Sequence, residues 1–188
     1  MKRFILAITG ASGACYAKRL FDILKDRSEL HVVISERGIE LLNLELSLKT
    51  SYFFGDNVTL YKNSKINTCI ASGSFYTDGM IIVPASMNTI SSISNGITDN
   101  LIKRAADVMI KEKRELVLVP RETPLNALHL KNMTKLAQLG VKIFPPNPPY
   151  YLFPKNIEDI NDFIVQKLMV AIGVQDKLPD NYIYNEKE

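Results

Sequence analysis

Two cations and an Arg-Glu pair are the groups of this sequence best suited to bind a phosphate-bearing ligand. Arg104 and Lys111 are seven residues apart, so in a helix they point in nearly the same direction, roughly 10 Å apart along the axis. Both can face one anion. Asp107 lies between them at i+3 and i+4 spacing, however, and on the helix alone surface ion pairs are the favoured interpretation.

An apolar run that ends in Arg121 and Glu122 shifts the balance toward a binding site. Residues 116–119 read LVLV, the pattern of a strand buried on both faces in a parallel sheet. Ligands of open α/β sheets bind at the carboxyl ends of the strands, which is where Arg121 and Glu122 would lie. The sequence therefore predicts that these residues serve a ligand that carries a phosphate.

The segment TGASG at residues 9–13 predicts a second ligand-binding element. It follows the first apolar run and opens a helix, so its backbone N–H groups and the helix dipole can hold a phosphate. It does not match the GxGxxG fingerprint, lacks the Lys of a P-loop and is not a GxSxG nucleophile elbow. Because a glycine turn after a first strand is also common for purely geometric reasons, both interpretations stay open.

Small polar residues follow two further predicted strands. Ser35 ends one of them, and PASMNT at residues 84–89 ends another. Each serine is also a favourable helix N-cap. Together with residues 10–12 and 121–122, however, they would form four polar strand ends at one edge of the sheet, which independent caps explain less easily. Residues 86–89 also carry the hydrogen-bonding groups needed to read the edge of a heterocycle.

Glu45 and a proline-rich loop each leave two interpretations open. Glu45 lies in a leucine-rich helical segment, where it is either on the solvated face or turned into a site. Residues 145–154, PPNPPYYLFP, form a stiff aromatic loop that is either a lid or a cover for the core or a subunit interface. His31 and His129 have no Ser or Cys partner legible in the sequence and receive no catalytic role.

Composition is typical of one cytoplasmic domain. The 188 residues, 46% of them hydrophobic, suffice for one core, so residues 1–188 are predicted as a single domain with a tail from about residue 175. A net charge of +3 without a basic tract argues against nucleic-acid binding. Cys15 and Cys69 stand alone, so neither a disulfide framework nor a metal site is indicated. No apolar stretch approaches membrane-spanning length, and Gly10 and Gly13 cut the first apolar run short of a signal peptide.

The elements that must position these residues alternate along the chain. Strands are predicted at the apolar runs 4–9, 30–35, 80–84, 116–120 and 141–145. Helices are predicted between them, with apolar residues at helical spacing at Tyr16, Leu20, Ile23 and Leu24 and at Leu128, Met133, Leu136 and Leu139. Residues 49–64 show no clear period and are expected to be loop or short irregular structure. The fold class is therefore α/β, a doubly wound, Rossmann-like three-layer sandwich with a mostly parallel sheet.

The motifs taken together resemble the UbiX-type flavin prenyltransferases. They are TGASG, SGSF at residues 72–75, PASMNT, DNL at 99–101, RAADV at 104–108, LVLVPRETP at 116–124 and HLKNM at 129–133. The resemblance spans about residues 2–173, and its specific part runs from RAADV through PRETP. It implies a flavodoxin-like Rossmann fold, bound FMN and metal-independent transfer of a dimethylallyl group from dimethylallyl phosphate to flavin N5 and C6. The product would serve UbiD-type decarboxylases, and the enzyme would be a homo-oligomer, a dodecamer in the family.

The resemblance also assigns residues. It implies FMN contacts for Gly10, Ala11, Ser12, Ser35, Ser86, Met87, Asn88, Thr89 and Arg121. It implies that the phosphate donor is held by Ser12, Arg104, Lys111, Arg121, Glu122, Tyr151 and Lys167, with Glu45 also at the site. Glu122 would handle protons during phosphate departure, and Arg104 and Lys111 would reach a neighbour's flavin site.

Two positions depart from the family pattern. Ala85 stands where many members have Cys, and Asn88 where many have Lys, so PASMNT partly resembles the PASANT of related cysteine-decarboxylating flavoproteins. Those enzymes use a His upstream of the motif, and residues 67–74 contain none. Cysteine decarboxylation is therefore the disfavoured enzymatic alternative, and a flavin-carrying accessory subunit of a decarboxylase is the non-catalytic one.

Overall fold

Runs of apolar residues build a parallel sheet that is buried on both faces. The computed structural model describes residues 1–183. In that range the sheet has six strands, all paired in parallel. They are β1 (Arg3–Ile8), β2 (Glu29–Ile34), β3 (Val58–Lys62), β4 (Gly79–Ala85), β5 (Glu115–Pro120) and β6 (Lys142–Ile143). In β1, Phe4, Leu6 and Ile8 face one core, and Ile5 and Ala7 face the other.

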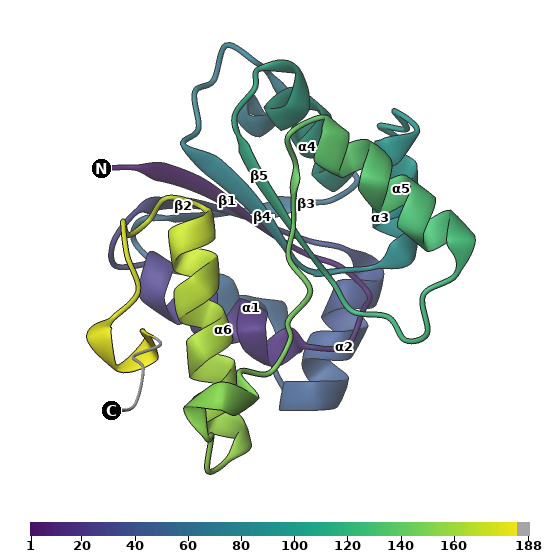
Figure 1. Cartoon of the computed structure of the whole chain (residues 1–188). Helices are drawn as coiled ribbons and strands as arrows, with labels where there is room; N and C mark the ends of the chain where they lie inside the picture. Colours follow the sequence, from purple (N-terminus) through teal and green to yellow (C-terminus); the bar gives the residue numbers. More distant parts are fainter. Residues whose placement is uncertain (184–188) are drawn as a thin grey trace.

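Helices cover both faces of this sheet, as Figure 1 shows. One face carries α1 (Ala14–Leu24), α2 (Glu36–Leu46) and α6 (Ile157–Ala171). The other carries α3 (Met87–Ser94), α4 (Leu101–Lys111) and α5 (Ala127–Gln138). Short 3₁₀ turns lie at η1 (Thr50–Phe53), η2 (Cys69–Ala71), η3 (Tyr150–Leu152) and η4 (Asp180–Tyr182). The predicted α/β three-layer sandwich is confirmed.

The strand order creates a switch point beside β1. The order is β3-β2-β1-β4-β5-β6, so the chain moves outward from β1 on one side and then returns to pair β4 on its other side. Open α/β sheets bind ligands in the crevice outside the carboxyl ends of the strands at such a point. The loops that follow β1 and β4 are therefore the first place to look for a site.

The expectation of loop for residues 49–64 was wrong. This segment contains η1 and the edge strand β3, which pairs with β2 from Leu30 opposite Val58 to Ile34 opposite Lys62. The strand was hidden because VTLYK is only half buried and lacks the continuous apolar run of the central strands. Without β3, the remaining strands follow the order 2-1-3-4-5, which is the flavodoxin-like arrangement.

The end of one strand and the burial of one helical residue differ from the sequence pattern. β6 is shorter than the predicted run 141–145, since Pro145 and Pro146 lack the N–H groups that would extend the ladder. In α5, Met133 and Leu136 are buried, whereas Leu128 is 70% exposed although it belongs to the same apolar period.

The predicted tail folds back in its described part. The Tyr182 ring contacts the Phe163 ring of α6, with centroids 5.7 Å apart. The end of the predicted tail, residues 184–188, lies outside the described residues. Within residues 1–183, no helix combines the length and apolarity that a membrane span requires.

Candidate functional site

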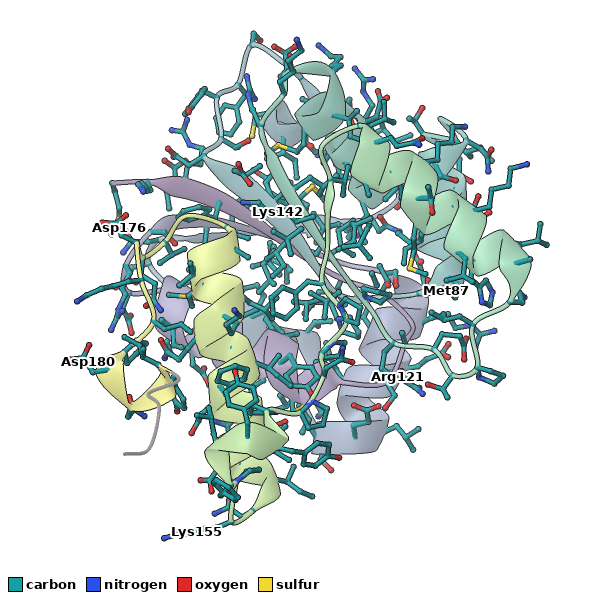
Figure 2. All side chains as sticks on the ribbon, in the orientation of Figure 1. Met87, Arg121, Lys142, Lys155, Asp176 and Asp180 are labelled. Atoms are coloured by element: carbon teal, nitrogen blue, oxygen red, sulfur yellow. The ribbon has the colours of Figure 1, made fainter. Side chains whose placement is uncertain are left out.

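A cavity of about 450 Å³ opens at the carboxyl edge of the sheet, where loops after β1, β4 and β5 meet α2. Met87 and Arg121, two of its lining residues, are labelled in Figure 2. The lining comprises Gly10, Ala11, Ser12, Leu41, Leu44, Glu45, Ser86, Met87, Arg121 and Glu122. Residues from three of the four predicted strand ends thus share one crevice, and it lies at the switch point.

Glu45 lies at the N-terminus of α1 rather than on a purely solvated helix face. Its carboxylate accepts hydrogen bonds from the backbone N–H groups of Ala14 at 2.8 Å and Gly13 at 3.1 Å. The anion position that the TGASG loop was expected to offer a phosphate is therefore filled by a side chain of α2. Any phosphate bound in this cavity must use other donors.

The electrostatics of this contact keep Glu45 ionised. Partial burial acts to raise the pKa of Glu45, but a hydrogen bond from the Ser12 hydroxyl, the N–H groups of Ala14 and Gly13, and the positive charge of Arg121 together lower it. The helix dipole of α1 acts in the same direction. Ser12, Glu45 and Arg121 are thus already coupled within one chain.

The two predicted serines do act as helix N-caps, but they differ in position. Ser35 Oγ accepts the N–H of Gly38 at 3.0 Å and begins α2. Ser86 Oγ accepts the N–H of Thr89 at 3.3 Å, contacts the Thr89 hydroxyl at 3.0 Å and begins α3. Ser86 lines the cavity as well. Ser86 can therefore serve both as a helix cap and as a ligand contact. Ser35 caps α2 but is not among the residues that line the cavity.

Arg121 and Glu122 are exposed at the mouth of the cavity, directly after β5. The Glu122 carboxylate accepts the N–H of Thr123 at 3.1 Å, which holds it beside its own backbone. One guanidinium and two carboxylates, those of Glu45 and Glu122, therefore line this crevice. The arrangement supplies a cation for a ligand's phosphate and an exposed carboxylate next to it.

Arg104 and Lys111 are not among the residues that line this cavity. Arg104 is ion-paired with Asp107 at 2.8 Å and donates from Nε to the carbonyl of Ala71 at 3.2 Å. Lys111 pairs with Glu112 at the end of α4, shortly before β5 begins. The physical reason is direction: α4 runs back toward the start of β5, so its last turn lies at the amino edge of the sheet.

Tyr151 and Lys167 are also outside the lining of the cavity. Tyr151 belongs to η3, and its ring contacts the Phe163 ring with centroids 6.3 Å apart. Lys167 is exposed on α6. The proline-rich segment 145–154 runs from β6 to α6, as the green trace in Figure 1 shows, and Leu152 packs against the core beneath it. Within this chain only part of the segment packs on the core, since the Tyr150 and Phe153 side chains are largely exposed.

A second cavity, of about 560 Å³, lies between α1 and α6. Its charges are already neutralised: Lys18 pairs with Asp22 at 2.8 Å, and Arg19 pairs with Glu158 and Asp162. Among the described residues, its lining thus offers no free cation for a phosphate. Within residues 1–183, no group of three or more His, Cys, Asp or Glu side chains is placed to hold a metal ion.

Several motif residues outside the cavity have structural partners. Asn100 caps α4 by accepting the N–H of Lys103 at 3.1 Å. His129 forms a capping box with Asn126 at the start of α5, and Asn132 accepts the hydroxyl hydrogen of Ser94 at 2.9 Å to join α5 to α3. DNL and HLKNM therefore shape the helices that surround the site.

Leu41, Leu44 and Thr9 were missed by the sequence reasoning. Leu41, one helical turn before Glu45, and Leu44, directly before it, both line the cavity. Their spacing from Glu45 could therefore have identified them as site residues from the sequence. Thr9 is 2% exposed and bonds to the chain on either side of Ala85. In the sequence, Thr9 is distinguished only as a polar residue at the end of an apolar run.

Comparison with known proteins gives consistent matches over nearly the whole chain. The family model described as Flavoprotein matches residues 1–169. A protein of Methanocaldococcus jannaschii named flavin prenyltransferase UbiX is 41% identical, covering 94% of this chain and 96% of its own length.

Two solved structures are similar in both sequence and fold. AnUbiX (PadA1), in complex with FMN and dimethylallyl pyrophosphate, has a TM-score of 0.92 and 36% identity, covering 100% of this chain and 99% of its own. A dodecameric FMN-dependent UbiX-like decarboxylase from Escherichia coli O157:H7 has a TM-score of 0.87 and 38% identity, covering 91% of this chain and 94% of its own.

Proposed function

The chain belongs to the flavoprotein family, among its flavin prenyltransferases, and on that premise we propose that it transfers a dimethylallyl group to reduced FMN. The donor is dimethylallyl phosphate, and the group becomes attached at flavin N5 and C6 to close a fourth ring. The product, prenylated FMN, is the cofactor of a UbiD-type decarboxylase. The observation that carries this proposal is the convergence of Ser12 and Glu45 with Arg121 and Glu122 on one cavity.

The residues present in this cavity fit a flavin. Leu41, Leu44 and Met87 offer apolar surface to a ring system, Ser12 and Ser86 offer hydroxyl oxygens, and Arg121 offers hydrogen-bond donors beside it. Cofactor sites combine apolar walls with placed polar groups, and this cavity contains both kinds of residue. The residues that would hold FMN are Gly10, Ala11, Ser12, Ser35, Ser86, Met87, Asn88, Thr89 and Arg121.

Each charged residue of the cavity then has a task. When bound and reduced, the flavin supplies an electron-rich ring as the acceptor of the allyl group. Arg121 stabilises negative charge that develops on the phosphate as the allylic C–O bond breaks. Glu122 handles the proton of the departing phosphate. Glu45 stays ionised because of its contacts with Ser12, Gly13 and Ala14, so it orients the Ser12 hydroxyl rather than donating a proton.

The remaining cations come from neighbouring copies. Lys111 lies at the opposite edge of the sheet from the cavity, and Arg104 is held by Asp107 and Ala71. If they act on the phosphate, a second copy of the chain must bring them. The dodecameric structure of the E. coli relative supports such an assembly, and we extend the proposal to Tyr151 and Lys167.

Anaerobic incubation with reduced FMN and dimethylallyl phosphate, followed by mass spectrometry of the flavin, tests the activity. We expect the mass of FMN plus one C5 unit, equally with and without EDTA. A parallel arm with dimethylallyl pyrophosphate, the ligand named for AnUbiX, shows which donor is used. Unmodified flavin in both arms would refute the proposal, and loss of turnover with EDTA would refute metal independence.

A further inference from the structure

We infer that Thr9 is a positioning residue for the flavin, because its buried hydroxyl fixes the start of α3. This inference rests on the proposed function and adds a residue that makes no contact with the cavity itself. Thr9 follows β1 and is 2% exposed. Its hydroxyl donates to the carbonyl of Pro84 at 2.8 Å and accepts the N–H of Ser86 at 2.8 Å.

These hydrogen bonds take the place of the backbone ladder between β1 and β4, which ends before residue 9. β1 and β4 are paired as far as Ala7 opposite Ile82, and the register between β4 and β5 shifts between Ile82 and Ala85. Beyond that point, the Thr9 N–H also donates to Pro84 O, at 3.2 Å. The side chain of Thr9 thus continues the connection between the two strands up to Ser86, where α3 begins.

The consequence is a defined set of donors at the N-terminus of α3. The first N–H groups of a helix have no acceptor inside the helix. The Ser86 N–H is bound by Thr9 and the Thr89 N–H by Ser86 Oγ. The structure, over residues 1–183, gives no acceptor for the N–H groups of Met87 and Asn88, which remain to bind a carbonyl or anionic group of the flavin.

Removing the Thr9 hydroxyl while keeping its shape should therefore weaken flavin binding without emptying the core. Thr9→Val leaves the Ser86 N–H without its acceptor and frees the turn at residues 84–86. Leaving one buried donor unpaired corresponds to about a tenfold or greater loss of affinity when it falls on a binding loop. Thr9→Ser keeps the hydroxyl and should restore binding to within about threefold.

Thr77 provides a matched control. It is also 2% exposed, and its hydroxyl contacts the sulfur of Met109 at 3.3 Å, near the amino end of β4. Thr77→Val makes the same chemical change at the same burial but at the opposite edge of the sheet. It should leave FMN affinity within about threefold of the wild type, whatever it does to stability.

The experiment is a titration of flavin-free protein with FMN, followed by quenching of flavin fluorescence, for wild type, Thr9→Val, Thr9→Ser and Thr77→Val. Thermal unfolding without flavin shows that each variant is folded; if Thr9→Val is not, Thr9→Ala takes its place with the same expected loss. Equal affinity of the hydroxyl-free Thr9 variant and wild type would overturn the inference alone. An equal loss in Thr77→Val, or no rescue by Thr9→Ser, would also overturn it, whereas a wild type that does not bind FMN would overturn the proposed function as well.

Discussion

At the scale of single residues, Glu45 shows how neighbouring hydrogen-bond donors and a positive charge stabilise the ionised form of an exposed carboxylate. It reaches from α2 to the first N–H groups of α1, and the Ser12 hydroxyl and Arg121 charge add to the effect of those donors. A general acid would need a pKa near the working pH, and these contacts move the pKa of Glu45 the other way. Among the described residues, Glu122 has no comparable set of donors, and it is the residue to which we assign proton transfer in the proposed reaction.

The lowered pKa of Glu45 predicts a pH-dependent contribution to stability. Because the folded-state pKa is below the unfolded value of about 4.5, the contribution is full above that pH and is lost as the pH falls through the folded value. We expect Glu45→Gln to lower the free energy of unfolding at pH 7 by about 1 kcal/mol or less, since the group is exposed and screened. Chemical denaturation between pH 7 and 3 should show the difference closing below pH 4.5.

Glu40→Gln is the control for that measurement. Glu40 lies on the same helix and pairs only with the exposed Arg37, at 2.6 Å, within the described part of the chain. We expect a smaller difference from wild type at pH 7 than for Glu45→Gln. A Glu45→Gln difference that stays constant down to pH 3 would contradict the assigned role of the charge.

Glu122→Gln separates flavin binding from chemistry. Gln keeps the size and hydrogen-bonding capacity of Glu122 but cannot carry a proton, so FMN should still bind. Prenyl transfer should slow by about 100-fold, as is typical for a lost acid-base group. Single-turnover assays at saturating FMN measure the rate, with FMN titration as the control for binding. A wild-type rate would show that Glu122 is only a surface residue.

At the scale of elements, helix direction and capping decide which side chains can meet. α4 begins where Asn63 accepts two of its first N–H groups: the Asn63 carbonyl binds the Leu101 N–H at 2.8 Å, and Asn63 Oδ1 binds the Ile102 N–H at 3.2 Å. Since Asn63 directly follows β3, the edge strand and the start of α4 are fixed to each other. This contact helps to set where Arg104 and Lys111 lie on the surface.

Replacing Asn63 tests that connection. Asn63 is 7% exposed, so Asn63→Ala leaves the Ile102 N–H without its acceptor in a buried place. We expect the free energy of unfolding to fall by about 1–3 kcal/mol in urea denaturation. Asn57→Ala is the matched control at the other end of β3, where the side chain is exposed and the backbone carbonyl binds the Leu30 N–H; it should change stability by about 0.5 kcal/mol or less. Equal effects of the two variants would rule out the capping role of the Asn63 side chain.

At the scale of the whole molecule, one chain supplies two separate sets of charges. Arg121, Glu45 and Glu122 lie at the carboxyl edge of the sheet, while Lys111 lies at the amino edge. Because α4 ends at Lys111 near the start of β5, it cannot bring Lys111 to the carboxyl edge of the sheet, where the cavity lies. A site that uses both sets is therefore incomplete without another copy of the chain, and activity should depend on assembly.

Mixing two inactive variants tests this shared site. Lys111→Ala and Arg121→Ala each remove a charge from a different set, so each alone should lose most activity. Co-expressed at equal amounts, they should regain roughly a quarter of wild-type activity, because random assembly pairs intact sets at that frequency. Arg121→Ala mixed with Glu122→Gln is the control, since both changes fall in the same set and no recovery is expected.

Light scattering alongside the activity assay gives the size of the active species. A fully active monomer would contradict the shared site. So would the absence of recovery in the mixed assembly while both variants remain oligomeric.

The sequence by itself determined the layers and the polar strand ends. Continuous apolar runs such as residues 116–119 and 80–84 fit strands buried on both faces, which requires helices on each side of a parallel sheet. Parallel strands bring all their carboxyl ends to one edge, so the sequence pattern alone places Gly10, Ser86 and Arg121 in one crevice. The family motifs then indicated the chemistry.

Only the tertiary structure decided which of those residues meet within a chain. β3 is half exposed, so its pattern lacks the burial signal that marked the central strands. Glu45 fills the N-terminus of α1 because α2 packs beside α1, a contact between helices that periodicity does not encode. Arg104 and Lys111 both lie on α4, in its first and its last turn, and Lys111 is carried away from the cavity because the helix must return to the start of β5. Spacing along the chain fixes local direction, whereas the distance between groups on different elements follows from how those elements pack.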